Sequence, residues 1–449
     1  MIAAFTVSFL YGCKCGWILA NIQTFLSDSS PIQATHDDIS WMTSISFTSS
    51  IFAVILCLKI GDRFSHRQIL TCIDAFYVIV WTLILFTSSI RIIIICFFLY
   101  GIASGLQYII MCAYIGEITD PQNREVLGLT IYLAGGIGTE VEYLLSYLNS
   151  YYLLALFPLL ISIFGLFISH WMVDSPYYLV SQDESDVALK HLAYLNDKNE
   201  EEECLEELQD VREYVDEHRN IWSVKNNLAI MFMPANLKLL LILILVNGLS
   251  HMSGSTLVSM TGSFLLKDFT SSVDGDQFTN VFNLLRIGMD FCTFYTVKKF
   301  DRRTLFLVGY PAVGLLHLIC GLCYYVESEN GNSIDWLAQV IAFLLIIFAI
   351  VSSQTYHIAL GILKLEIFPH KFKEFYSSLL LCTCDWFIFA VNRSYFSLEP
   401  VFGNAFLMTV FGIVHFATAA IIYFYINDTK NKTLLQIRTE INSEFCSSD

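Results

Sequence analysis

Apolar residues in this chain gather into long uninterrupted runs separated by short polar stretches. Each run is about 20 residues long, which is the length that an α-helix needs to cross a bilayer. None of the runs alternates apolar with polar residues, as a strand of a membrane barrel would. The runs predict membrane-spanning helices near residues 1–21, 41–60, 68–88, 92–113, 127–148, 152–172, 237–258, 279–297, 304–325, 337–360, 376–396 and 405–425.

Composition supports the same class of protein. Apolar residues make up 55% of the chain and charged residues only 15%, whereas a soluble domain carries about 25% charged residues. Helices satisfy all their backbone hydrogen bonds internally, which the bilayer interior demands. We therefore expect an all-α polytopic membrane protein with about twelve transmembrane helices in two lobes of six.

A polar segment divides the predicted spans into two halves. Between residues 181 and 225 it holds 14 Asp and Glu against 5 Lys and Arg, a balance of −9 within a total of −16. Apolar residues recur in it at three- and four-residue steps, which predicts short amphipathic helices. These residues are Ala188, Leu189, Leu192, Leu195, Leu205, Leu208, Val211 and Val215. The predicted division is a lobe at 1–173, an acidic linker at 174–235, a second lobe at 236–426 and a tail at 427–449.

The distribution of Lys and Arg predicts the orientation, because cytosolic loops are enriched in these residues. Basic residues fall in alternate loops, in the linker and in the tail, so we expect both termini and the linker to be cytosolic. The first run lacks the basic start and cleavage site of a signal peptide, and we interpret it as a retained span. That span starts almost at Met1, which leaves open the alternative that the natural protein has a further segment before it.

Patterns typical of enzymes are missing from the sequence. It shows no catalytic triad, no phosphate-binding Walker loop and no metal-ligand spacing among its 13 cysteines. Gly135-Gly136-x-Gly138 lies inside a predicted span, where small residues let helices approach closely. We expect no enzymatic activity, no cofactor and no nucleic-acid partner; the expected partners are a small solute and the lipid bilayer, with the monomer as the functional unit.

Seven short motifs follow one another in a defined order. They are Gly12-x-x-x-Gly16-Trp17; Asp62-Arg63-Phe64-Ser65-His66-Arg67; Tyr114-x-x-Glu117 with Arg124; Asp174-Ser175-Pro176-Tyr177-Tyr178-Leu179; Arg302-Arg303-x-Leu305; Glu366-Ile367-Phe368-Pro369; and Asp428-Thr429-Lys430-x-Lys432-Thr433-Leu434. Each is weak alone, but with this order and spacing the chain resembles the sugar porter family of the major facilitator superfamily. Its motifs are most similar to those of the facilitated trehalose and glucose transporters.

This resemblance implies a network of charges at the cytosolic helix ends that helps to close that side of the carrier. The implied members are Asp62, Arg67, Glu117, Arg124, Asp174, Arg302, Arg303, Glu366 and Asp428. We expect Glu117 to meet the basic residues near Arg302 and Arg303 in the other lobe. The alternative is that the basic residues only set the topology.

The resemblance also implies a solute site near the bilayer midplane. The positions matching it are Lys14, Tyr132, Ser250, His251, Thr256, Gly361, Asp385 and Trp386. Sugar hydroxyls need paired donors and acceptors, and several amides of the family pattern are replaced here. Tyr132 stands for a glutamine, and Asp385 stands for an asparagine before Trp386.

Lys14 occupies a first-span position that is acidic in proton-coupled relatives and neutral in facilitative ones. We hypothesise that it pairs with Glu140 or Glu142, while the alternatives are that Lys14 snorkels to the interface or that both acids lie near it. His251 and His357 are interpreted as packed polar residues rather than proton relays.

These features lead us to expect a facilitative uniporter of a sugar such as trehalose or glucose in the plasma membrane. Two alternatives stay open: a carrier of the same fold for another solute, such as an anion, and a non-transporting nutrient sensor.

Overall fold

A computed structural model describes most of the chain. The described residues are 2–27, 30, 32–60, 63–119, 121–195, 204–218, 234–254, 256–258, 265–266, 275–330, 335–357 and 373–425. They contain helices and no strand, and eight of these helices are long and apolar enough to cross a membrane. Every span predicted from the sequence overlaps an observed helix.

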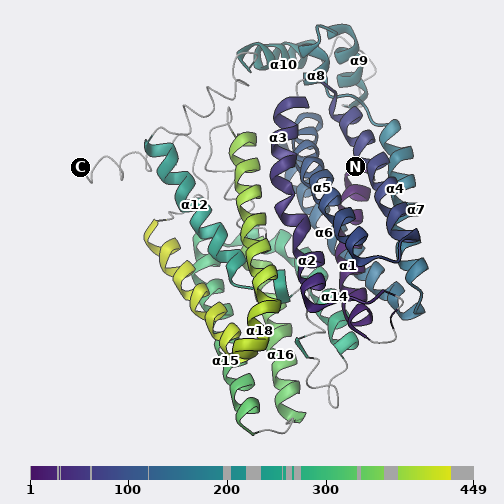
Figure 1. Cartoon of the computed structure of the whole chain (residues 1–449). Helices are drawn as coiled ribbons and strands as arrows, with labels where there is room; N and C mark the ends of the chain where they lie inside the picture. The colour runs from purple at the N-terminus through teal and green to yellow at the C-terminus, as the bar shows by residue number, and fades with distance from the viewer. Residues whose placement is uncertain are drawn as a thin grey trace.

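The first half of the chain forms one group of helices. They are α1 (Ile2–Leu26), α2 (His36–Thr48), α3 (Ser50–Ile60), α4 (His66–Phe86), α5 (Ile90–Ile118), α6 (Pro121–Leu145), the 3-10 turn η1 (Ser146–Leu148) and α7 (Tyr151–His170). Within the group, α1 packs on α6, α4 on α7 and α3 on α5. These contacts define the N-terminal lobe (Figure 1).

The second half forms the C-terminal lobe. Its helices are α12 (Pro234–Met252), α14 (Gly275–Lys299), α15 (Arg302–Asn330), α16 (Asp335–Ser352), the π-helical turn η4 (Ser353–His357) and α18 (Lys373–Tyr425). The α18 segment combines the last two predicted spans, and its helical path breaks at Gly403, where φ is 74°. A positive φ of this kind is accessible to glycine at little cost, which explains the residue at this corner.

The two lobes meet mainly where α2 and α3 face α18 and where α6 faces α14. The remaining helices, α8 (Pro176–Ser181), α9 (Ser185–Leu195) and α10 (Leu205–His218), lie beyond one end of the bundle (Figure 1). We call this end the linker end and the opposite end the distal end. The chain starts α2 at the distal end and finishes α3 at the linker end.

The amphipathic helices predicted in the linker are confirmed. Their apolar faces form a small core of their own, separate from the core of the lobes, made by Leu179, Val180, Ala188, Leu192, Ala193, Cys204, Leu208, Val211 and Val215. Leu205, which the periodicity also assigned to this face, is exposed instead. It is the first residue of α10, where the helix has only begun.

Hydrogen bonds at the helix starts explain why two spans begin earlier than their apolar runs. Thr35 caps α2, because its hydroxyl accepts from the Asp38 backbone N–H (3.2 Å) and the Asp38 carboxylate accepts from the Thr35 N–H (3.0 Å). Ser65 and Gln68 form the same reciprocal arrangement at α4. Polar capping residues lie outside any apolar window, so hydropathy placed these starts too late.

Glycines bring α1 and α6 into close contact. A Cβ atom on Gly12 would overlap the carbonyl oxygen of Gly135, and one on Gly138 would overlap the carbonyl oxygen of Phe9. The interpretation of Gly135-Gly136-x-Gly138 as a helix-packing motif is therefore confirmed.

Candidate functional site

Lys14 lies at the centre of α1 and is almost fully enclosed, with 1% of its surface exposed. Its ammonium group donates to the Ser46 hydroxyl of α2 at 3.0 Å. It also lies 4.7 Å from the ring centroid of Tyr11, 5.3 Å from that of Phe47 and 5.6 Å from that of Tyr100. Aromatic faces attract a cation, and more strongly where water is excluded. Lys14 is therefore held inside the protein and does not snorkel.

Asp385 of α18 faces the same region from the C-terminal lobe. Its carboxylate interacts electrostatically with Lys14 and with Tyr11. The first lobe thus contributes a cation and the second an anion to the junction between them. Such a pair offsets the cost of holding either charge away from water.

Other ionisable groups gather where α6 meets α14. Glu140 of α6 faces Asn283 and Arg286 of α14, and Arg286 also interacts with Asp290 on its own helix. Together with Lys14 and Asp385, these residues place two cations and three carboxylates among the described residues of the lobe junction.

The hypothesis that Lys14 pairs with Glu140 or Glu142 is wrong. Glu140 points toward α14, and Glu142 is buried against Cys13 and Gly16 of α1. The two acids are two residues apart on α6, so they project about 200° apart, and neither projection leads to the Lys14 ammonium group on the α2 side of α1.

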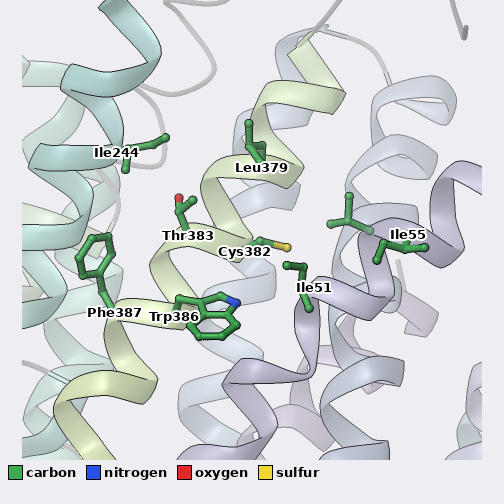
Figure 2. A pocket seen from close by; sticks show the side chains of 9 residues that line it. Ile51, Ile55, Ile244, Leu379, Cys382, Thr383, Trp386 and Phe387 are labelled. Carbon is green, nitrogen blue, oxygen red and sulfur yellow. The ribbon is translucent and has the colours of Figure 1, made fainter. Parts of the chain in front are cut away.

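A cavity of about 350 Å³ lies between α3 of the N-terminal lobe and α12 and α18 of the C-terminal lobe (Figure 2). Side chains of α3, α12 and α18 surround it: Ile51, Val54, Ile55, Ile244, Leu379, Cys382, Thr383, Trp386 and Phe387. Trp386 is 48% exposed, and Figure 2 shows its indole at the edge of this space. The surface of the cavity is apolar, and the Thr383 hydroxyl donates to the Leu380 carbonyl of its own helix at 2.9 Å.

The other positions expected to bind solute fall into two groups. Ser250 is turned into the C-terminal lobe, where its hydroxyl bonds to the Val246 carbonyl (2.6 Å) and to the Tyr310 hydroxyl (2.5 Å). His251 and Thr256 are partly exposed near the end of α12. Gly361 and His357's side chain lie outside the described part of the structure, as does the side chain of Tyr132.

Sequence reasoning missed two amide side chains that are hydrogen-bonded inside the C-terminal lobe. Gln354 of η4 donates to the Met289 carbonyl at 2.6 Å and to the Thr293 hydroxyl at 2.8 Å. Asn247 of α12 donates to the sulfur of Cys384 on α18. The sequence did contain a signal for them. A single amide within an apolar run must find a hydrogen-bond partner when it is buried, so its position could have been noted.

Charges at the linker end pair within the N-terminal lobe. His66 lies 3.1 Å from Glu117, and Arg67 lies 3.1 Å from Asp174. The expected contact of Glu117 with Arg303 is not made in this conformation, because Arg303 donates instead to the Tyr423 carbonyl of its own lobe at 2.9 Å. The other members of the expected network fall outside the described residues or have undescribed side chains: Asp62, Arg124, Arg302, Glu366 and Asp428.

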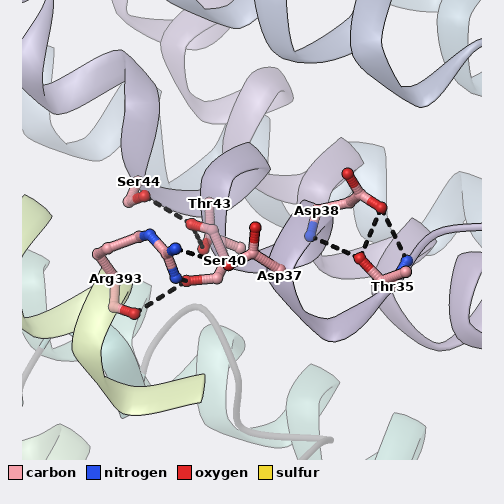
Figure 3. A network of polar contacts seen from close by, with 7 residues as sticks. All are labelled: Thr35, Asp37, Asp38, Ser40, Thr43, Ser44 and Arg393. Atoms are coloured by element: carbon pink, nitrogen blue, oxygen red, sulfur yellow. Dashed lines mark hydrogen bonds and ion pairs between the residues drawn. The ribbon is translucent and has the colours of Figure 1, made fainter. Parts of the chain in front are cut away.

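One of the polar contacts between the lobes lies at the distal end (Figure 3); another joins Asn280 of α14 to the Tyr147 hydroxyl of η1. Arg393 of α18 bonds to Asp37 (2.6 Å) and to the Ser40 hydroxyl (3.1 Å), both on α2. Its guanidinium group also lies 4.9 Å from the ring centroid of Trp41.

Three comparisons bear on this geometry. A family model described as "Sugar (and other) transporter" matches residues 1–441. The chain is 21% identical over 413 residues to the facilitated trehalose transporter Tret1 of Polypedilum vanderplanki, covering 91% of this chain and 80% of that protein. It is 23% identical over 449 residues to the sugar transporter ERD6-like 2 of Arabidopsis thaliana, covering 97% and 92% of the two chains.

Solved structures agree on the fold. The inward open conformation of the xylose transporter XylE from E. coli superposes with a TM-score of 0.79 at 15% identity, covering 98% of each chain. XylE bound to 6-bromo-6-deoxy-D-glucose gives 0.77 at 16% identity, covering 98% of this chain and 97% of that chain.

Two helical lobes with a cavity between them have the major facilitator fold, the fold of XylE. Since the family model extends over nearly the whole chain, the chain belongs to the sugar (and other) transporter family.

Proposed function

We propose that this chain carries a sugar, such as trehalose or glucose, across the plasma membrane by facilitated uniport. The observation that carries the proposal is the position of the cavity: it lies between the lobes on the linker side, while the lobes are joined at the distal end. In a carrier that works by alternating access, the solute site is reached from one side of the membrane at a time, so one side is closed while the other is accessible.

The environment of Lys14 supports uniport. Relatives that couple transport to protons have an acid at this first-span position, and here an ammonium group is already bonded to Ser46 and enclosed by aromatic rings. At this position the chain therefore lacks the carboxylate that those relatives have.

The same environment weakens the case for an anionic solute. Lys14 would favour an anion if its charge were uncompensated, but Asp385 lies opposite it. A neutral polyhydroxy solute avoids the cost of bringing a further charge to the site.

The orientation proposed is with the linker helices α8–α10 and both termini in the cytosol. The clustering of Lys and Arg in the loops at the linker end supports it. The distal end would then face the outside, and the cavity would open toward the cytosol.

Counterflow in proteoliposomes tests the proposal. Purified protein would be loaded with unlabelled sugar and offered labelled trehalose, glucose or an organic anion, with and without a pH gradient. Saturable sugar exchange that does not respond to the gradient is expected. Exchange of the anion alone would show that the protein is a carrier of anions. Faster sugar exchange in the presence of the pH gradient would show that transport is coupled to protons. Absence of exchange from folded protein would favour the sensor.

A further inference from the structure

Contact between α2 and α18 follows one face of each helix at the distal end. Asp37 and Ser40 meet Arg393, and the ring of Trp41 lies 6.1 Å from that of Phe389. Further along, Phe47 packs on Ile388. Because the residue numbers rise on α2 as they fall on α18, the two helices pack antiparallel. We call this set of contacts the distal seam.

Arg393 makes several polar contacts across the distal seam. One guanidinium nitrogen donates to the Asp37 carboxylate and the other to the Ser40 hydroxyl, which in turn donates to the Arg393 carbonyl at 3.0 Å. The face of the guanidinium lies over Trp41. Charge-assisted bonds of this kind are stronger than neutral ones, and the Arg393 side chain is only 27% exposed.

The receiving side of the contact belongs to a helix start that is capped by its own residues. Asp37 lies in the first turn of α2, directly beside the Thr35–Asp38 cap shown in Figure 3. The Ser40 carbonyl accepts the Thr43 hydroxyl at 3.1 Å. A preorganised partner loses little side-chain freedom when the ion pair forms.

The distal seam ends where the α2–α3 helix is interrupted. Consecutive hydroxyls bond back to carbonyls three residues earlier at this point: Thr48 to Ile45 (2.9 Å), Ser49 to Ser46 (2.9 Å) and Ser50 to Phe47 (2.8 Å). Such bonds compete with the helix ladder and bend it. At this point the Cys382 sulfur of α18 lies 3.6 Å from the Ser50 carbonyl.

Beyond this interruption the same two helices separate around the cavity. Ile51 and Ile55 of α3 line one wall, and Cys382 and Trp386 of α18 line the other (Figure 2). The serine-rich break thus lies at the boundary between the closed and the open part of one helix pair.

We propose that Arg393, together with Asp37, Ser40 and Trp41, is a latch that holds the distal side closed, and that the break at Thr48–Ser50 is the hinge about which α2 and α3 respond when it opens. The inference rests on the alternating access of the proposed function, but it does not depend on which solute is carried. Losing the latch shifts the conformers toward a state open at the distal end.

A cysteine at position 44 reports on this opening. Ser44 is fully buried on the same face of α2 as Ser40 and Phe47, and Ser44→Cys changes one atom. The detergent-purified full chain would be treated with a bulky maleimide, and modification of residue 44 followed by peptide mass spectrometry, which separates it from the native cysteines. Labelling is expected to be slow with the latch intact and about tenfold faster in Arg393→Ala, the change that ~1.4 kcal/mol produces.

Two further variants make the test decisive. Arg91 is an exposed arginine at the start of α5, so Arg91→Ala is the matched control and should leave the labelling rate unchanged. The charge swap Asp37→Arg with Arg393→Asp should return labelling toward the slow rate, which general loosening of the fold would not do. Equal rates in Arg393→Ala and Arg91→Ala, or a swap that labels as fast as Arg393→Ala, would overturn the latch. If labelling responds as expected while no sugar is exchanged, the latch stands and the solute assignment fails.

Discussion

The ammonium group of Lys14 and the hydroxyl of Ser46 lie 3.0 Å apart and connect α1 to α2 at the centre of the N-terminal lobe. This bond explains how the chain retains a cation in a membrane-spanning helix. Three aromatic rings lie around it, and the Asp385 carboxylate attracts it electrostatically. An ionisable group buried at such depth is usually functional.

The charge pair between Lys14 and Asp385 predicts mutual dependence. Lys14→Met should remove the electrostatic attraction on the Asp385 carboxylate and lower the melting temperature. Adding Asp385→Asn should recover much of that loss, because no charge then remains alone. A double variant no more stable than Lys14→Met would show that the two charges do not interact.

The position of Trp386 at the edge of the cavity predicts that its removal changes solute affinity more than stability. Trp386→Ala removes an aromatic surface from the edge of the cavity, and KM for the transported sugar should rise about tenfold, with little change in melting temperature. Trp171, which is exposed at the end of α7, supplies the matched control Trp171→Ala. Equal KM values in the two variants would remove Trp386 from the solute site.

Close packing of α1 on α6 predicts a steric effect of a single methyl group. Gly138→Ala should cost about 1–3 kcal/mol of stability, since the added Cβ meets the Phe9 backbone and not a movable side chain. Gly288 has no atom within 4 Å of an added Cβ, so Gly288→Ala should leave the melting temperature unchanged or raise it. The prediction fails if both substitutions behave alike.

The ion pair of Arg67 with Asp174 predicts a small, salt-dependent effect. Both residues belong to the N-terminal half and the Arg67 side chain is 36% exposed, so Arg67→Gln should change stability by less than about 1 kcal/mol. Raising the salt concentration should reduce that difference further. A large loss of transport at unchanged stability would instead show that this pair takes part in closing the cytosolic side, as the sequence led us to expect.

Much of the architecture could be predicted from the sequence, because its signals are local. The length of each apolar run reports how far a helix must extend in lipid, and the period of Ala188, Leu192, Leu208 and Val211 reports which face of the linker helices is buried. Motif order was sufficient to recognise the family, which the match over residues 1–441 confirms.

Only the tertiary structure decided which charges meet. Lys14 lies nearer in sequence to Glu140 than to Asp385, but the direction in which each side chain leaves its helix selects the partner, and that depends on how α1, α6 and α18 are packed. The same holds for Arg393 and Asp37, which are 356 residues apart in the chain and 2.6 Å apart in space. Helix formation is determined by neighbouring residues, whereas the partners of a buried charge are determined by the arrangement of the two lobes.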